Sequence, residues 1–271
     1  MRLYNMPINM KKILYFFSAL ILVLTSCSSD DSSSSQDDSI LPKTISYTYP
    51  DFPQDNSIST ITYDGNKIVS IVKLGSKTVF TYDGNRIIKQ EVFDVYFNGG
   101  QFKNTEVSYT YEKEKLKTKI LRDGYSTEYP DGDYIYKTVY THTSDVLVSF
   151  IAYRVNADTQ AETKSNQGNL TYKGGNLVKQ QLVAEGFTET MTFNYDSKNN
   201  PLKNVTGFNL LLDEVGDFGI NNNVEATRTN THYPNSVTYK SNYIYNNKNY
   251  PIKRTSLTSG GSIELEIEYT Y

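Results

Sequence analysis

Apolar and polar residues alternate along most of the chain beyond residue 40, and short runs rich in Gly, Asn and Asp interrupt the alternation. In "TITYDGNKIVSI" at residues 60–71, Ile61 and Tyr63 alternate with threonines until the polar run begins. A period of two is typical of β-strands with one buried face, and Gly, Asn and Asp are typical of turns. The pattern predicts an all-β domain over residues 40–271.

One unit of this pattern recurs, and each copy begins with an aromatic residue. Residues 63–71 read "YDGNKIVSI" and residues 82–90 read "YDGNRIIKQ". Further copies open at Tyr111, Tyr172, Tyr195 and Tyr245, a degenerate copy opens at Tyr140, and "IEYTY" at the carboxyl end reads as a last strand. Each copy combines an aromatic residue, a polar turn, an apolar residue and usually a Lys or Arg, which predicts a series of β-hairpins.

The polar residues of the unit are expected to be structural turn residues. Adjacent Asp, Gly and Asn supply the positive φ angles that short hairpin loops need. This assignment covers Asp64, Gly65, Asn66, Asp83, Gly84, Asn85, Gly174, Gly175 and Asn176. The Tyr before each turn is expected to pack against the Ile or Leu after it, and such a pair contributes about 0.2–1 kcal/mol.

A sheet built from such hairpins twists, and a single flat layer would expose both of its faces. We therefore expect an antiparallel meander of about a dozen strands that curls into a rolled sheet or open barrel. Its inner face is expected to be aliphatic and its outer face to carry the tyrosines.

The amino-terminal segment has the order of a secretion signal. Two lysines precede an apolar run from Ile13 to Leu24, and Cys27 follows shortly after. The run is too short to span a bilayer as a helix. "LTSC" resembles the lipobox of bacterial lipoproteins, which implies removal of residues 1–26 and a diacylglyceryl group on Cys27. A membrane-anchor helix or a buried core segment is the alternative, and translation starts at Met1 or Met10.

Residues 27–39 carry no apolar side chain after the Cys and are expected to form a disordered tether, because they bury too little surface to offset the entropy of ordering. The segment "SSDDSSSSQDDS" resembles the acidic export signal of Bacteroidota surface lipoproteins, which implies display on the outer membrane surface. A plain periplasmic spacer is the alternative. "DSI" resembles an O-glycosylation sequon of that phylum, which implies modification at Ser39.

The hairpin unit resembles the YD or RHS repeat of bacterial surface proteins, whose pattern is Tyr, Asp, two variable residues, Gly, Arg and Leu. "YDGNRI" at residues 82–87 is one residue shorter, and "YDSKNNPL" at residues 195–202 is one longer with Asn in place of Gly. The chain also resembles small Bacteroidota surface lipoproteins of unknown function that carry such hairpins. The resemblance covers about half of the chain beyond the leader and implies the hairpin unit, but not the closed shell of long RHS arrays.

Residues 206–236 depart from the repeat and read as an insertion. Long interruptions of a regular scaffold carry function disproportionately often, so partner contacts are expected there, and residues 221–223 are expected to be dispensable for folding. In the alternative interpretation, Phe208 and the leucines at 210–212 plug one end of the sheet, and contacts then lie on the Tyr-bearing outer face.

Charge and side-chain chemistry narrow the function. Without the three bases of the leader, 24 bases face 30 acids, and a domain without a basic stripe is not expected to bind nucleic acid. Asp213, Glu214 and Asp217 lack the spacing of a calcium loop and read as a solvated loop. One Cys and two His give no metal, cofactor or catalytic motif, so we expect no enzyme, although carboxylate pairs leave no motif.

Two functions remain open. The first is a non-catalytic cell-envelope lipoprotein with a structural or protein-interaction role at the outer membrane surface. The second is a glycan-binding surface lipoprotein of a polysaccharide uptake system, in which Tyr rings stack on sugars. The lack of Trp counts against the second, because Trp offers the largest stacking face. An exposed aromatic platform would favour it.

Overall fold

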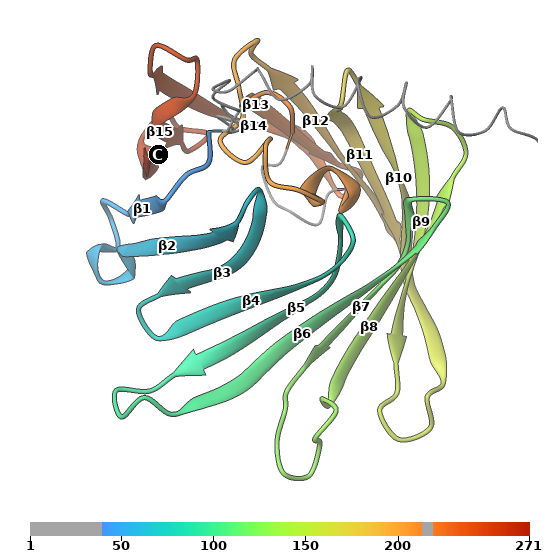
Figure 1. Cartoon of the computed structure of the whole chain (residues 1–271). Coiled ribbons are helices and arrows are strands. Elements are labelled where there is room, and N and C mark those ends of the chain that lie inside the picture. Colours follow the sequence, from blue (N-terminus) through green and yellow to red (C-terminus); the bar gives the residue numbers. More distant parts are fainter. Residues whose placement is uncertain (1–39, 213–218) are drawn as a thin grey trace, which may run out of the picture. The chain divides into compact units, whose positions relative to one another are not determined.

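A computed structural model describes residues 40–212 and 219–271, and it shows sixteen strands in one sheet. Each strand pairs antiparallel with the next, and β1 pairs with β16, which closes the sheet into a barrel (Figure 1). The predicted all-β antiparallel meander is confirmed, with more strands than expected. The strands are β1 (Thr44–Thr48), β2 (Ser57–Asp64), β3 (Lys67–Lys73), β4 (Ser76–Asp83), β5 (Arg86–Val95), β6 (Gln101–Glu112), β7 (Lys115–Asp123), β8 (Tyr134–His142), β9 (Leu147–Val155), β10 (Glu162–Lys173), β11 (Asn176–Ala184), β12 (Phe187–Tyr195), β13 (Asn223–Asn230), β14 (Tyr233–Tyr245), β15 (Pro251–Leu257) and β16 (Ile263–Thr270).

The repeated unit is a hairpin with a fixed register. Tyr63 lies opposite Ile68, and the copies at Tyr82, Tyr111 and Tyr172 show the same pairing with the residue five positions later. In each of these hairpins the register shifts next to this pair, which leaves one extra residue, such as Val69, on the second strand. A β-bulge of this kind increases the local twist, so its repetition helps to curl the sheet.

Residues on one strand alternate between the lumen and the outside. Tyr109 is buried and Tyr111 packs against the core, whereas the intervening Thr110 is exposed. The tyrosines at the turns therefore point inward. This orientation is favourable because the rings pack against buried aliphatic residues and are removed from water. The expectation that these tyrosines lie on the outer face was wrong, and the inner face combines aliphatic residues with tyrosines.

The two ends of the barrel differ. We call the end with the tight turns after β2, β4, β6, β8, β10 and β14 the turn end, and the opposite end the mouth. Gly65 and Gly84 occupy two of the tight turns with φ values of +57° and +59°. The mouth carries the connections after β5, β7 and β9, which hang away from the barrel in Figure 1.

Residues 200–212 form a plug across the turn end and include the short 3-10 helix η3 (Phe208–Leu210). Leu211 and Phe208 are buried, and the Phe208 ring lies 6.2 Å from that of Phe80 on β4. Gly207 sits so close to the β4–β5 turn that a Cβ would lie 2.8 Å from the Asn85 carbonyl oxygen. Figure 1 shows this orange segment beside the turns of β2–β3 and β4–β5.

The plug joins the main hydrophobic cluster, whose other members come from strands around most of the barrel. These buried members are Ile45, Ile61, Ile68, Ile87, Tyr109, Leu116, Tyr140, Val148, Phe150, Leu170 and Ile267. The segment 206–236 is therefore not a single insertion. Its first part belongs to the plug, and from Asn223 onward it forms β13 and the start of β14. The interpretation of Phe208 as part of a plug is confirmed.

Asparagine side chains hold the remaining side of the plug. Asn222 is 1% exposed, and its amide nitrogen donates to the carboxylate of Asp196 and to the carbonyl of Asn199. Asn176, at the start of β11, accepts from the backbone of Asn221 and donates to its side chain at 2.9 Å. The structure argues against the expectation that residues 221–223 are dispensable for folding, because Asn222 is buried and the side chains of Asn221 and Asn222 donate hydrogen bonds to other segments.

Candidate functional site: the barrel lumen

The sequence-predicted residues fall into two groups. Cys27, Ser39 and the acids at 213, 214 and 217 lie outside the described residues. The predicted turn residues all lie at the turn end: Asp64 and Asp83 end β2 and β4, Asn176 begins β11, and the turns are formed by Gly65, Asn66, Gly84, Asn85, Gly174 and Gly175. Their positions fit a structural role, and Asn176 also holds the return of the plug segment.

Cross-strand pairing identifies the inner wall of the lumen. Opposed residues of an antiparallel pair share one face of the sheet. Buried Ile267 lies opposite both Tyr47 and Arg254, and Arg254 lies opposite Tyr243. Lys73 lies two residues beyond Ile71, whose partner on β2 is buried, so Lys73 also faces the lumen. Polar and aromatic residues thus line the half of the lumen toward the mouth.

Three adjoining cavities occupy this part of the lumen. One of about 350 Å³ contacts Met191, Phe193, Tyr239, Ser241 and Ser256 among others. The second, of about 230 Å³, is lined by Tyr47, Tyr49, Ser57, Ser59, Ile71, Lys73, Ser76 and Thr78. The third, of about 100 Å³, reaches the plug. The first and second share Tyr49, the second and third share Tyr47, and Arg254 lines the first and third. Together they form one candidate binding site with the plug as its floor.

Arg254 is positioned by its neighbours on the wall. Its Nε donates a hydrogen bond to the Ser241 hydroxyl at 3.2 Å, and Ser241 lies opposite the buried Ser256. A guanidinium carries five donors in a planar fork that matches carboxylate and sulfate groups. The site therefore combines a fixed cation with hydroxyls and Tyr rings.

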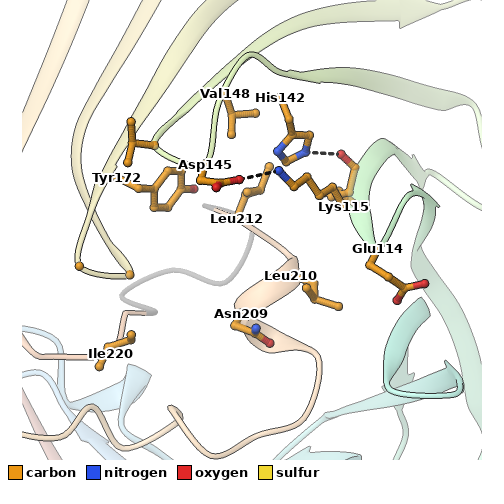
Figure 2. Close-up of a pocket in the computed structure, with 14 residues that line it drawn as sticks. Glu114, Lys115, His142, Asp145, Val148, Tyr172, Asn209, Leu210, Leu212 and Ile220 are labelled. Atoms are coloured by element: carbon orange, nitrogen blue, oxygen red, sulfur yellow. Dashed lines mark hydrogen bonds and ion pairs between the residues drawn. The ribbon is translucent and has the colours of Figure 1, made fainter.

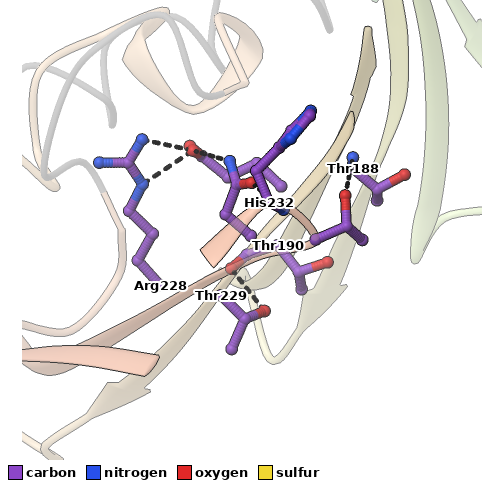
Figure 3. A network of polar contacts seen from close by, with 8 residues as sticks. Thr188, Thr190, Arg228, Thr229 and His232 are labelled. Atoms are coloured by element: carbon purple, nitrogen blue, oxygen red, sulfur yellow. Dashed lines mark hydrogen bonds and ion pairs between the residues drawn. The ribbon is translucent and has the colours of Figure 1, made fainter. Parts of the chain in front are cut away.

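A second inner-wall arginine is held differently. Arg228 on β13 donates from Nε at 2.7 Å and from Nη2 at 2.5 Å to the Glu189 carboxylate, which also accepts from Asn230 (Figure 3). This pair raises the pKa of Arg228 through the hydrogen bond and charge of Glu189. The pair ties β12 to β13 near the mouth.

A further pocket of about 330 Å³ lies at the turn end (Figure 2). His142, Asp145, Lys115 and Leu212 line it, and Lys115 bonds Asp145 at 2.8 Å. His142 Nε2 donates to the Leu116 carbonyl at 2.8 Å, since a carbonyl oxygen only accepts. This side chain has a structural partner, and the pocket adjoins the end of the plug.

His142 takes the place that Tyr occupies in other repeats. Tyr111 donates to the Ile87 carbonyl at 2.7 Å and Tyr195 to the Leu177 carbonyl at 2.8 Å. In each case the acceptor is the residue that pairs with the Tyr of the preceding hairpin. Burial raises the pKa of Tyr111 to about 12. In the degenerate copy, His142 therefore makes the hydrogen bond to the preceding hairpin that Tyr makes in these copies. The sequence pattern had instead suggested Tyr140 as the start of this copy.

A metal-binding cluster and a membrane-spanning helix are both absent from the described part of the chain. Residues 40–212 and 219–271 contain no three His, Cys, Asp or Glu side chains close enough to hold a metal ion. No helix among the described residues is long and apolar enough to cross a membrane.

The barrel has a counterpart among solved structures. It resembles a porin-like protein from Bacteroides vulgatus. The two are 14% identical, with 86% of this chain and 98% of that chain covered and a TM-score of 0.59. A porin-like protein from Bacteroides uniformis is 10% identical over 84% of this chain and 97% of that chain, with a TM-score of 0.49. At this identity the likeness to the first supports the barrel fold alone.

No family model and no curated protein matches the sequence. The resemblance to YD repeats therefore stays a prediction that rests on the hairpin unit. The residues of the lumen site were not singled out from the sequence, because Arg254 and Lys73 belong to strands at opposite ends of the chain. Only the pairing of β1 with both β2 and β16 brings their walls together.

Proposed function

We propose that the chain is a non-catalytic, lipid-anchored binding protein of the bacterial outer membrane and that the mouth half of its lumen holds a glycan. The observation that carries this proposal is the lumen, which is floored by the plug and walled by hydroxyls, Tyr rings and Arg254. Sugars present hydroxyl groups and weakly apolar ring faces, which suit such a wall.

The plug favours a binding site over a pore. A barrel of sixteen strands is wide enough to enclose an aqueous channel. Here Val205, Phe208 and Leu211 pack against the inner wall near the tight turns. Burial of each of these side chains contributes about 1.5–3 kcal/mol to the stability of the fold, so apolar contacts hold the plug in place.

The outer face favours a barrel in water. Outward positions carry paired hydroxyls, such as Thr110 with Thr118 at 2.5 Å, and ion pairs, such as Lys253 with Glu266 at 2.8 Å. A membrane-spanning barrel needs an apolar outer band about 25 Å tall, and a Lys or Arg at its centre costs about 2–4 kcal/mol. Attachment through a lipid on Cys27 reconciles this face with an outer-membrane location.

The entry of the chain into the barrel orients the mouth. The Ile40 carbonyl accepts from Asn204 of the plug, and the Pro42 carbonyl accepts from Tyr63 at the turn end. A tether of thirteen residues from Cys27 to Ile40 reaches at most about 45 Å. Lipidation at Cys27 would therefore attach the barrel to the membrane through the segment that enters it at the turn end.

A glycan screen with a lumen-filling variant tests the function. The full chain, purified in detergent, is screened against neutral and acidic oligosaccharides. Thr78→Trp places a large side chain in the cavity that Thr78 lines, while Val79→Trp places the same side chain on the outer face of β4. Binding by the wild type and Val79→Trp but not by a folded Thr78→Trp is expected. Absence of glycan binding, or equal binding by both variants, would overturn the proposal.

A protein-interaction function has less support from the structure than glycan binding. From the sequence, partner contacts were expected either in segment 206–236 or on tyrosines of the outer face. The described parts of that segment form the plug and strands, and the tyrosines at the turns point inward.

A further inference from the structure

We propose that the ligand of the lumen is an acidic saccharide, whose carboxylate or sulfate group is bound by Arg254 and Lys73. This inference rests on the proposed function and names the ligand class of the same site.

Three basic residues line the cavities, and two of them, on β3 and β15, are brought together by the closure of the sheet; the third, Lys240 on β14, lies 4.0 Å from Glu225. Arg254 lies on β15 and lines two of the three cavities, and Lys73 ends β3 and lines the third. Tyr47 lines both a cavity with Lys73 and a cavity with Arg254, so the two cations line adjoining cavities.

Carboxylates are scarce around this space. Among the described residues that line the three cavities, Glu264 is the one acid, and it lies at a bulge of β16 beside the mouth. The Nε of Arg254 donates to the Ser241 hydroxyl. The described lining of the three cavities therefore holds more bases than acids, which suits an anionic ligand.

The cavity that contains Lys73 suits a saccharide better than an acidic peptide. In the cavity with Lys73, seven of the eight lining residues carry a hydroxyl or an ammonium group. Their hydroxyls both donate and accept hydrogen bonds, as a ligand with many hydroxyls requires. Apolar peptide side chains would find only Ile71 there.

Paired probes isolate the contribution of charge. Tetrasaccharides of uronic acids and sulfated sugars are compared by calorimetry with their methyl-esterified or desulfated counterparts, which keep the size and the hydroxyls. The full chain is compared with Arg254→Gln and Lys73→Gln. Lys253→Gln and Lys77→Gln serve as controls, because both lysines face outward: Lys253 is next to Arg254 on β15, and Lys77 is on β4, which pairs with the strand of Lys73.

At least one acidic probe is expected to bind about tenfold or more tightly than its neutral counterpart, with the difference shrinking as salt rises. Arg254→Gln and Lys73→Gln should each remove most of this preference, and both controls should retain it. Equal binding of acidic and neutral probes would overturn this inference and leave the proposed function standing. Binding of no saccharide would overturn both, and tighter binding of an oligoglutamate peptide would replace the saccharide by a peptide.

Discussion

The Tyr111 hydroxyl donates a hydrogen bond of 2.7 Å to the backbone carbonyl of Ile87 on the preceding hairpin. Ile87 is 0% exposed and pairs with Tyr82, the equivalent tyrosine of that hairpin. The bond therefore links one repeat to the next at the rim where the plug sits. This bond explains why a Tyr recurs at this position of the repeat, which the chemistry of the turn alone does not explain.

Removing this hydroxyl should destabilise the barrel. Tyr111→Phe keeps the ring but leaves the Ile87 carbonyl unbonded, at a cost of about 0.5–1.5 kcal/mol. Urea unfolding followed by circular dichroism measures the change. Tyr153→Phe is the control, because Tyr153 lies on the outer side of β9, and it should change stability by less than about 0.5 kcal/mol. Equal effects of both substitutions would contradict the proposed link between repeats.

Buried tyrosines predict a loss of stability at high pH. Burial raises the pKa of Tyr82 and of Tyr111 to about 12, while an unfolded Tyr titrates near 10. Their contribution is therefore complete below pH 10 and is lost as the pH rises from about 10 to about 12. Urea midpoints measured from pH 9 to 12 should fall in this window. The double variant Tyr82→Phe and Tyr111→Phe should show a shallower fall, and an unchanged slope would contradict the assignment.

The asparagine network predicts a sensitive position in the plug segment. Asn222→Ala removes two hydrogen bonds to part-buried acceptors on Asp196 and Asn199 and should cost about 1–3 kcal/mol. Asn242→Ala, at an exposed position of β14, serves as the control and should be nearly neutral. Thermal unfolding compares the two. An Asn222→Ala variant as stable as the control would show that this segment is dispensable after all.

Local chemistry made the hairpins predictable, because alternation and turn residues act within a few positions of each other. Thus the register of Tyr63 with Ile68 could be expected from "YDGNKI" alone. Closure could not be predicted, since it depends on β1 meeting β16 more than two hundred residues away. The inward direction of the tyrosines follows from that closure. The role of Asn222 was hidden as well, because consecutive asparagines read as a loop until their partners on distant strands are known.

Lipidation remains a prediction that a single substitution tests. Cys27→Ser should abolish incorporation of labelled fatty acid and release the protein from the membrane fraction, whereas Ser28→Ala should retain both. Protease added to intact cells should remove the barrel if it is displayed on the surface. Labelled lipid on the Cys27→Ser variant would refute the anchor, and full protection from protease would indicate the periplasmic side.

The central claim, that ligand binds inside the lumen, has a direct optical test because the chain contains no Trp. Phe193→Trp places a single reporter on the wall of the largest lumen cavity, and Tyr153→Trp places one on the outer side of β9. Oligosaccharides identified in the screen are titrated against both variants. The emission of the Trp at 193 is expected to change saturably, while that of the Trp at 153 stays constant. A saturable change at 153 with none at 193 would contradict the central claim and move the binding site to the outer face.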